Sequence, residues 1–214
     1  MSLNSSHTPN CNGVILFSGE RILMYCSNVH LKFKKTKDPC FKKTKKGVLY
    51  LTTHRIIFKN KNMLDLLISF SMPFVSMKNV TLEQPLLFPI NVQGIIEPLP
   101  DGNFDTAVYF KLSFPNGGCI EFGRALAVAV EMAARTKNWE YSPTSIIIHQ
   151  ISSAPETCFT QGYYQGFQAP VAHFPEHPPA LSTFVTPCPP PYPGISQSDS
   201  HSHTRSMSSE QATR

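Results

Sequence analysis

The clearest hydrophobic pattern in the chain lies in residues 45–59. Residues 48–53 alternate from one face to the other and are rich in β-branched and aromatic side chains, which fit a pleated, half-buried surface. A polar break at residues 52–54 separates them from a second short run, residues 55–59, which is bounded by charge. Two extended runs joined by a short polar break predict a β-hairpin.

Side chains alternate between the two faces of a strand, so the same pattern predicts which residues of this hairpin lie together. Leu49 and Leu51 point one way and Tyr50 the other. Ile56 and Phe58 share one face, and the opposite face carries Arg55, Ile57 and Lys59. One face is therefore more apolar, and it needs further strands or a helix against it, because an isolated hairpin is only marginally stable.

Other short apolar runs before residue 140 supply the remaining strands, and a lysine-rich loop separates two of them at residues 34–46. The predicted strands are residues 14–17, 21–25, 29–33, 66–72, 75–82, 91–97, 107–114 and 119–122. Residues 115–118, Pro-Asn-Gly-Gly, predict a turn because Asn and Gly tolerate a positive φ.

The period changes after this turn, and residues 123–135 predict an amphipathic helix. Its apolar stripe has spacings of three and four and consists of Phe122, Leu126, Ala129, Val130 and Ala133. We therefore expect a mainly β fold, an antiparallel sandwich or barrel with one C-terminal helix that covers an open end.

Proline usage divides the chain. Ten of the 19 prolines follow residue 150, in a segment rich in Gln, Ser, Gly and aromatic residues. Such a segment buries too little apolar surface to offset the entropy of ordering it. We expect a flexible N-terminus at 1–10, a domain at 11–138, a partly ordered extension at 139–152 around Trp139, and a disordered Pro-rich tail at 153–214.

Cysteine spacing and the N-terminus bear on the compartment. The six cysteines are scattered without a Cys-x-x-Cys pair, and the N-terminal residues are polar without the apolar region of a signal peptide. We expect reduced thiols, with Cys26 and Cys119 buried, in a protein of the cytoplasm and nucleus. No apolar run approaches the roughly 20 residues of a membrane-spanning helix.

Positive charge is concentrated in residues 32–61, where ten lysines and Arg55 face Asp38 alone, against a net charge of +5 for the whole chain. Such a patch favours an anionic partner such as a phosphoinositide head group, although a plain solvated loop is the alternative. Phe33 and Phe41 are the only aromatic residues within its most lysine-rich part, residues 32–46, so sequence-specific nucleic-acid binding is not expected. The candidate residues are Lys32, Lys34, Lys35, Lys37, Lys42, Lys43, Lys45, Lys46 and Arg55.

A second candidate site is the run Pro189, Pro190, Pro191 and Tyr192 in the expected tail. A polyproline run is nearly preformed, so docking it into an aromatic-lined groove costs little conformational entropy, and the tyrosine adds a specific contact. Pro-Pro-x-Tyr is the ligand that one class of WW domain binds; the alternative is a plain linker.

No pattern indicates catalysis, a cofactor or a metal. His201 and His203 offer too few ligands for a closed metal site, and His54 fits a solvated turn residue better than a general base. The sequence lacks the nucleophile elbow, phosphate-binding glycine loop and paired metal histidines of common enzyme families. We therefore expect a non-enzymatic protein.

Several separated motifs, in order, resemble one family: residues 41–58, then 69–74, 83–85 and 118–122 with the alanine-rich helix. They are similar to the GRAM domain of the WW-domain-binding-protein-two family, and the segment around Trp139 is most similar to its sperm-associated member. The resemblance covers about residues 1–150. It implies a pleckstrin-homology-like fold and adaptor behaviour.

The resemblance also implies partners and locations. Family members bind WW domains of ubiquitin ligases and Yes-associated-type coactivators through Pro-Pro-x-Tyr, a role that transfers here to Pro189, Pro190 and Tyr192. Relatives act as chromatin-associated transcriptional coactivators of nuclear receptors, and the sperm member is linked to the perinuclear theca and egg activation. GRAM domains can bind phosphoinositides, so the lysine-rich loop is the alternative site for a membrane-surface role.

Overall fold

The computed structural model describes residues 2–87, 89–100, 102–103, 105–136, 150–160 and 162–195. Most of the extension expected at 139–152, including Trp139, lies outside these residues, as does the tail after residue 195. Within the described residues, no helix combines the length and the apolar character that crossing a bilayer requires.

The hairpin predicted at residues 45–59 is present as β4 (Lys45–Thr52) and β5 (Arg55–Asn60). Leu49 lies opposite Phe58 and Leu51 opposite Ile56, so these four side chains share one face, as predicted. Tyr50 lies opposite Ile57 on the other face.

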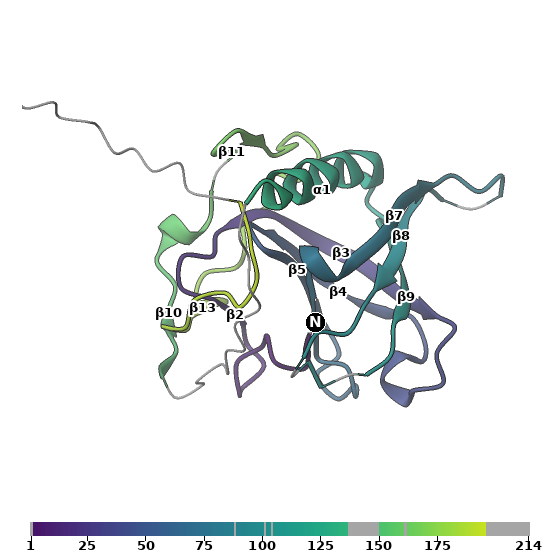
Figure 1. Ribbon diagram of the computed structural model, residues 1–214, viewed down its shortest axis with the longest axis horizontal. Helices are drawn as coiled ribbons and strands as arrows, with labels where there is room; N and C mark the ends of the chain where they lie inside the picture. The colour runs from purple at the N-terminus through teal and green to yellow at the C-terminus, as the bar shows by residue number, and fades with distance from the viewer. Residues whose placement is uncertain are drawn as a thin grey trace, which may run out of the picture.

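Eight strands form one antiparallel sheet around this hairpin, in the order β1-β6-β5-β4-β3-β9-β8-β7 (Figure 1). The predicted runs at 21–25 and 29–33 are one long strand, β3, which pairs with β4 on one side and β9 on the other. The remaining bounds are β1 (Ser2–Leu3), β3 (Ile22–Lys34), β6 (Ser69–Pro73), β7 (Met77–Glu83), β8 (Asn91–Ile96) and β9 (Val108–Ser113).

The C-terminal helix α1 (Cys119–Ala134) begins four residues earlier than predicted, so the strand expected at 119–122 was wrong. Gly117 and Gly118 both have positive φ, at 87° and 81°, which makes the predicted turn. Gly118 is also the residue that caps the helix, and its carbonyl accepts a hydrogen bond from the Phe122 amide at 2.9 Å. The chain thus enters a helix directly from the turn.

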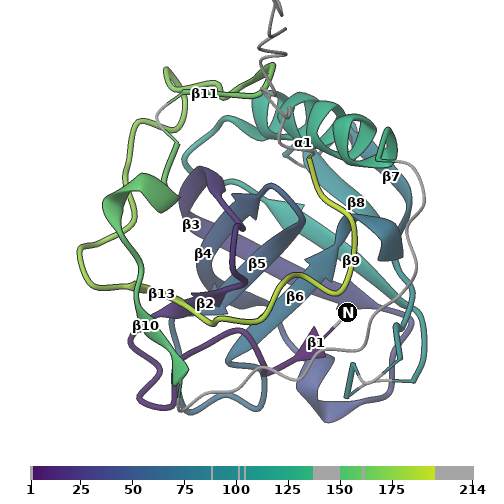
Figure 2. The same ribbon diagram turned by 60° about the vertical axis from the view of Figure 1, so that its left-hand side comes forward.

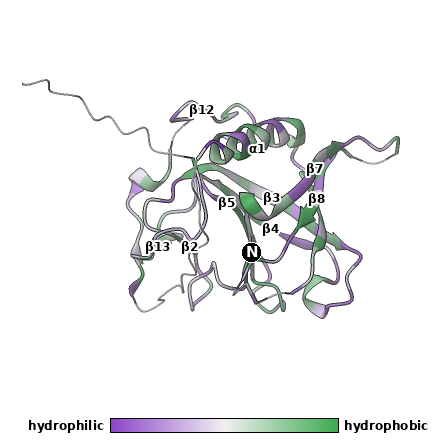
Figure 3. Ribbon diagram, in the orientation of Figure 1, coloured by the Kyte–Doolittle hydropathy of each residue, from purple (hydrophilic) through white to green (hydrophobic). Residues whose placement is uncertain are grey.

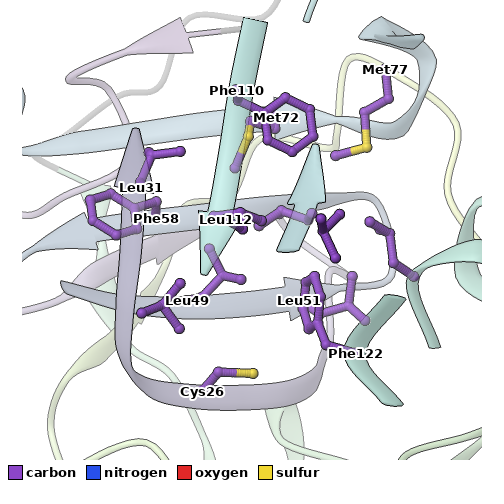
Figure 4. Close-up of a cluster of buried hydrophobic side chains, with 14 of the residues drawn as sticks. Cys26, Leu31, Leu49, Leu51, Phe58, Met72, Met77, Phe110, Leu112 and Phe122 are labelled. Atoms are coloured by element: carbon purple, nitrogen blue, oxygen red, sulfur yellow. The ribbon is translucent and has the colours of Figure 1, made fainter. Parts of the chain in front are cut away.

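The core lies between the curved sheet and α1, which covers one end of the sheet (Figure 1). Leu51 of the hairpin lies beside Phe122 of the helix there, and Phe58 lies beside Leu31 of β3 (Figure 4). Hydrophobic and hydrophilic residues alternate along α1, as its predicted stripe requires (Figure 3). Cys26 and Cys119 are buried as expected, and all six cysteines are free thiols.

The expectation of a disordered tail from residue 153 was wrong for the described residues up to 195. A second, three-stranded sheet contains β2 (Val14–Leu16), β10 (Ser152–Ser153) and β13 (Thr183–Val185), and β13 runs parallel to β2. The short strands β11 (Tyr163–Tyr164) and β12 (Phe167–Gln168) form a separate hairpin beside α1 (Figure 1).

This ordering has a physical cause in the hairpin. Tyr50 and Ile57 form a second buried cluster with Tyr25 on the face away from the main core. Phe159 and Val185 of the tail segment pack on that cluster. The segment is therefore ordered by apolar surface that belongs to the domain, which composition of the segment alone does not reveal.

The expectation of a flexible N-terminus at 1–10 was also wrong for residues 2–10. Leu3 pairs with Phe70 across β1 and β6. The Asn4 side chain accepts hydrogen bonds from the amides of Ile68 and Ser69, and its own amide group donates to the Leu66 carbonyl at 2.7 Å. These contacts attach the first residues to the edge of the sheet.

Candidate functional site

The proline-rich segment, residues 186–195, crosses the sheet as an ordered strap (Figure 2). It continues from β13, runs past β6 and rises toward the end of α1 (Figure 2). At its start the Thr186 amide donates to the Leu16 carbonyl at 3.0 Å, and the Ser18 amide donates to the Cys188 carbonyl at 2.9 Å. The strap thus prolongs the pairing between β13 and β2.

The four motif residues differ in accessibility. Pro189 is exposed and Pro190 is half-buried, whereas Pro191 and Tyr192 are buried, with Tyr192 only 7% exposed. The Tyr192 ring meets the Phe17 ring edge to face, with 5.9 Å between centroids. Its hydroxyl lies near Ser71 and Arg55, and burial raises the pKa of the phenol.

Arg55 lies beneath Tyr192. Its prediction as part of an anion-binding surface was wrong, because the side chain is fully buried. Its Nε and Nη2 donate to the two carboxylate oxygens of Glu20 at 2.8 and 2.9 Å. Nη1 donates to the hydroxyls of Ser6 and Ser71 at 3.1 Å each, and Nη2 donates to the Ile15 carbonyl at 2.9 Å. Every N–H direction of the guanidinium is therefore satisfied inside the protein.

The electrostatics of this pair follow from its burial. Burial alone raises the pKa of the Glu20 carboxyl, but the charge and hydrogen bonds of Arg55 outweigh it and hold that pKa below its usual value. The Phe17 ring covers the guanidinium, with 4.4 Å between the Arg55 Cζ and the ring centroid. Phe17 therefore contacts both Arg55 and Tyr192, and joins them in one aromatic and ionic cluster.

The end of the strap is held by the turn between β4 and β5. The Ile195 amide donates to the Thr53 carbonyl at 2.9 Å, and the Thr136 hydroxyl donates to the Gly194 carbonyl at 2.9 Å. Gly194 lies so close to the His54 ring that an added Cβ would overlap its atoms. The expectation that His54 is a solvated turn residue was wrong, because it is half-buried beneath the strap.

Most of the lysine-rich loop does lie on the surface. Lys32, Lys34, Lys35, Lys37, Lys42, Lys43 and Lys46 are exposed. Lys45 was assigned to that surface wrongly, because it is 4% exposed and its Nζ lies 2.5 Å from the Asp65 carboxylate. Phe41 anchors the loop by packing on Phe33, with ring centroids 4.6 Å apart.

Strand pairing brings some of these charges together. Lys32 of β3 lies opposite Lys111 of β9, and Lys46 of β4 lies opposite His30 of β3. All four positions belong to the outward face, because Leu31 between them is buried. We call this set of Lys32, Lys46, Lys111 and His30 the basic face; Lys111 was missed because it is far away in sequence.

Glu20, Phe17 and Ser71 were also missed as partners of the motif. The available signal was the acidic residue in the apolar region 14–25 and Arg55 among apolar neighbours in residues 55–58. Charged residues beside apolar strand residues can be buried, and buried charges are usually paired, although the sequence does not indicate which of them pair.

Breaking the buried pair should strongly destabilise the fold. We expect Glu20→Ala to lower the free energy of unfolding by about 3–5 kcal/mol, because it leaves the Arg55 charge buried without its counter-ion. The matched control is Glu131→Ala, which removes the exposed i,i+4 partner of Arg135 and should cost at most about 0.5 kcal/mol. Denaturant unfolding of both variants measures this, and equal losses would contradict the assignment.

Acidification should act on the fold through His54. Burial lowers its pKa below the ordinary 6.5, with the positive charge of Arg55 adding to the effect and Glu20 opposing it. The unfolded chain then binds more protons than the folded one, so stability is lost as the pH falls below 6.5. We expect the melting temperature to fall less for His54→Gln than for the native chain when the pH is lowered from about 7.5 to about 5.5. An equal fall in melting temperature for both proteins would refute this.

Comparison with known proteins places this geometry in a family. Residues 16–127 match the GRAM domain. The chain is 40% identical over 138 residues to the postacrosomal sheath WW domain-binding protein of Bos taurus, covering 63% of this chain and 44% of that protein. It is 33% identical over 201 residues to WW domain-binding protein 2 of Homo sapiens, covering 90% of this chain and 66% of that protein.

Among solved structures, the Vps36 N-terminal PH domain aligns with a TM-score of 0.43 and 19% identity, covering 61% of this chain and 92% of that domain.

The chain spans less than two thirds of the length of the two WW domain-binding relatives. The mainly β, pleckstrin-homology-like fold with one closing helix is confirmed. Because the family match takes in more than half of the chain, from β2 into α1, the chain belongs to the GRAM-domain family.

Proposed function

We propose that this protein is a non-enzymatic adaptor that binds WW domains through Pro189, Pro190 and Tyr192. The observation that carries the proposal is the Pro-Pro-x-Tyr run at residues 189–192, with Pro189 exposed and Pro190 half-exposed at the surface. The names of the similar proteins, which describe them as WW domain-binding, support it. In this proposal the domain is the scaffold that carries the motif.

The proposal extends to partners and place. WW domains of ubiquitin ligases and of Yes-associated-type coactivators are the partners that a Pro-Pro-x-Tyr ligand suits. Binding a coactivator would place the protein in the nucleus on chromatin, and binding a ligase would place it in the cytoplasm. A role in sperm would place it in the perinuclear theca, in line with the postacrosomal sheath in the name of the Bos taurus relative, and egg activation would be its task there. Immunolocalisation in developing sperm and somatic cells distinguishes these places.

A second function, binding to a phosphoinositide-bearing membrane surface, is favoured by the basic face. Lys32 and Lys111 are like charges directly opposite each other across two strands, an arrangement that costs stability unless an anion relieves it. Phosphate groups of lipid heads supply such an anion, and their attraction to each lysine is worth about 1 kcal/mol near an anionic membrane.

The WW proposal predicts that substituting one exposed proline weakens binding to the WW domain, and that substituting another exposed proline two residues away does not. Pro189→Ala should weaken binding of the full chain to a purified WW domain of the Pro-Pro-x-Tyr class by about tenfold or more, a loss of about 1.4 kcal/mol. Pro187→Ala is the matched control, because Pro187 is also exposed but lies outside the motif. Titration by isothermal calorimetry measures both, and undiminished binding by the Pro189 variant would count against the motif.

The membrane proposal predicts a charge- and site-dependent effect. Lys32→Glu should reduce co-sedimentation with vesicles that contain a phosphoinositide, and raising the salt concentration should reduce it for the native chain. Lys78→Glu makes the same charge change on β7, away from the basic face, and should have a smaller effect. Equal effects of the two substitutions would show that only net charge matters.

A further inference from the structure

The strap conflicts with the way a WW domain binds its ligand. A WW groove takes up the tyrosine side chain of Pro-Pro-x-Tyr along with its prolines. In this structure Tyr192 is 7% exposed, its ring meets the Phe17 ring edge to face, and its hydroxyl lies near Arg55 and Ser71. One side chain cannot occupy both sites, so the docked strap and the WW-bound strap exclude each other.

The site that holds Tyr192 is built by the rest of the fold. Arg55 is fixed by Glu20, by the Ile15 carbonyl and by two serine hydroxyls, so the guanidinium beside the tyrosine is positioned by other residues. Tyr192 lies over this buried ion pair and helps to exclude water from it. The domain therefore offers its own tyrosine a preorganised polar and aromatic pocket.

The attachment of the strap is weak between its ends. Five of the seven residues at 187–193 are prolines, which have no N–H to donate. This stretch therefore cannot make the ladder of backbone hydrogen bonds that joins β13 to β2. The Ser18–Cys188 hydrogen bond, Tyr192 and the contacts of Gly194 and Ile195 hold it, so it can open locally while β13 stays paired.

We propose that the GRAM domain masks its own WW ligand: Tyr192 is held in the pocket of Phe17, Arg55 and Ser71, and a WW domain captures only the population in which the strap has opened. This regulation rests on the proposed WW-binding function. The apparent dissociation constant of the full chain equals that of the free motif divided by the open fraction. The partner's affinity is thus set by the domain as well as by the motif.

The first test compares the full chain with a synthetic peptide of residues 184–198, each titrated with the same purified WW domain. The peptide has no domain to dock on, so it reports the affinity of the free motif. We expect the full chain to bind about tenfold or more weakly than the peptide. Tyr192→Ala in the peptide should abolish binding and shows that the motif itself is read.

A single substitution at Gly194 tests the mechanism without changing the motif. Gly194→Ala adds a Cβ that overlaps the His54 ring only when the strap is docked. The full-chain variant should therefore bind the WW domain more tightly, approaching the peptide. The same substitution in the peptide should leave its affinity unchanged. Adding His54→Ala removes the overlapping ring and should restore the weaker binding of the native chain.

Hydrogen exchange gives a readout from the domain side. Saturating the full chain with the WW domain should speed exchange of two amides that lose their acceptors when the strap opens. These are the Ile195 amide, which donates to the Thr53 carbonyl, and the Ser18 amide, which donates to the Cys188 carbonyl. The Thr186 amide, bonded to Leu16 beside β13, should stay protected and serves as the internal control.

The outcomes separate the two proposals. If the peptide binds and the full chain binds equally well, masking is wrong and the WW-binding function stands. If the Gly194→Ala chain gains no affinity while the Ile195 amide stays protected in the WW complex, masking is also wrong. If neither peptide nor chain binds the WW domain, the proposed function fails and the masking fails with it.

Discussion

The buried ion pair between Arg55 and Glu20 is the constraint on which the rest of this structure depends. A guanidinium and a carboxylate without water cost several kcal/mol each unless their hydrogen bonds are complete. Completing them here takes groups from the N-terminal segment (Ser6 and Ile15) and from β6 (Ser71), and Tyr192 of the strap lies beside the completed pair. Segments that composition marks as peripheral are thus fixed in place because the centre of the molecule needs their polar atoms.

Period-two patterns were sufficient for the parts of the fold in which apolar and polar residues alternate. The hairpin β4–β5, the pairing of its faces and the stripe of α1 all follow from local side-chain chemistry. The failures lie where a residue is governed by something distant. Cys119 reads as the start of a strand, yet two glycines with positive φ turn the chain straight into a helix. Arg55 reads as the charged boundary of a strand because its partner, Glu20, is 35 residues away.

The Pro-Pro-x-Tyr motif could be predicted from the sequence, but the contacts that surround it could not. The run at 189–192 is visible in any reading of the chain, but nothing within it indicates that its tyrosine lies on Phe17 or against Ser71. The lysine-rich loop shows the same limit: the register that sets Lys32 opposite Lys111 depends on how β3 pairs with β9, at a separation that local patterns do not encode. Composition indicated which residues are apolar or charged, but the strand topology determined which of them are neighbours.

The pairing of β13 with β2 changes what counts as the folding unit. The matched family region ends at residue 127, yet Tyr25, Tyr50 and Ile57 form an apolar cluster against which Phe159 and Val185 pack. A chain shortened to the helix would leave that cluster partly open to water, a surface prone to self-association. In this protein the matched GRAM region therefore ends before the packed unit does, and the proline-rich segment covers apolar surface of the domain as well as carrying the motif that others recognise.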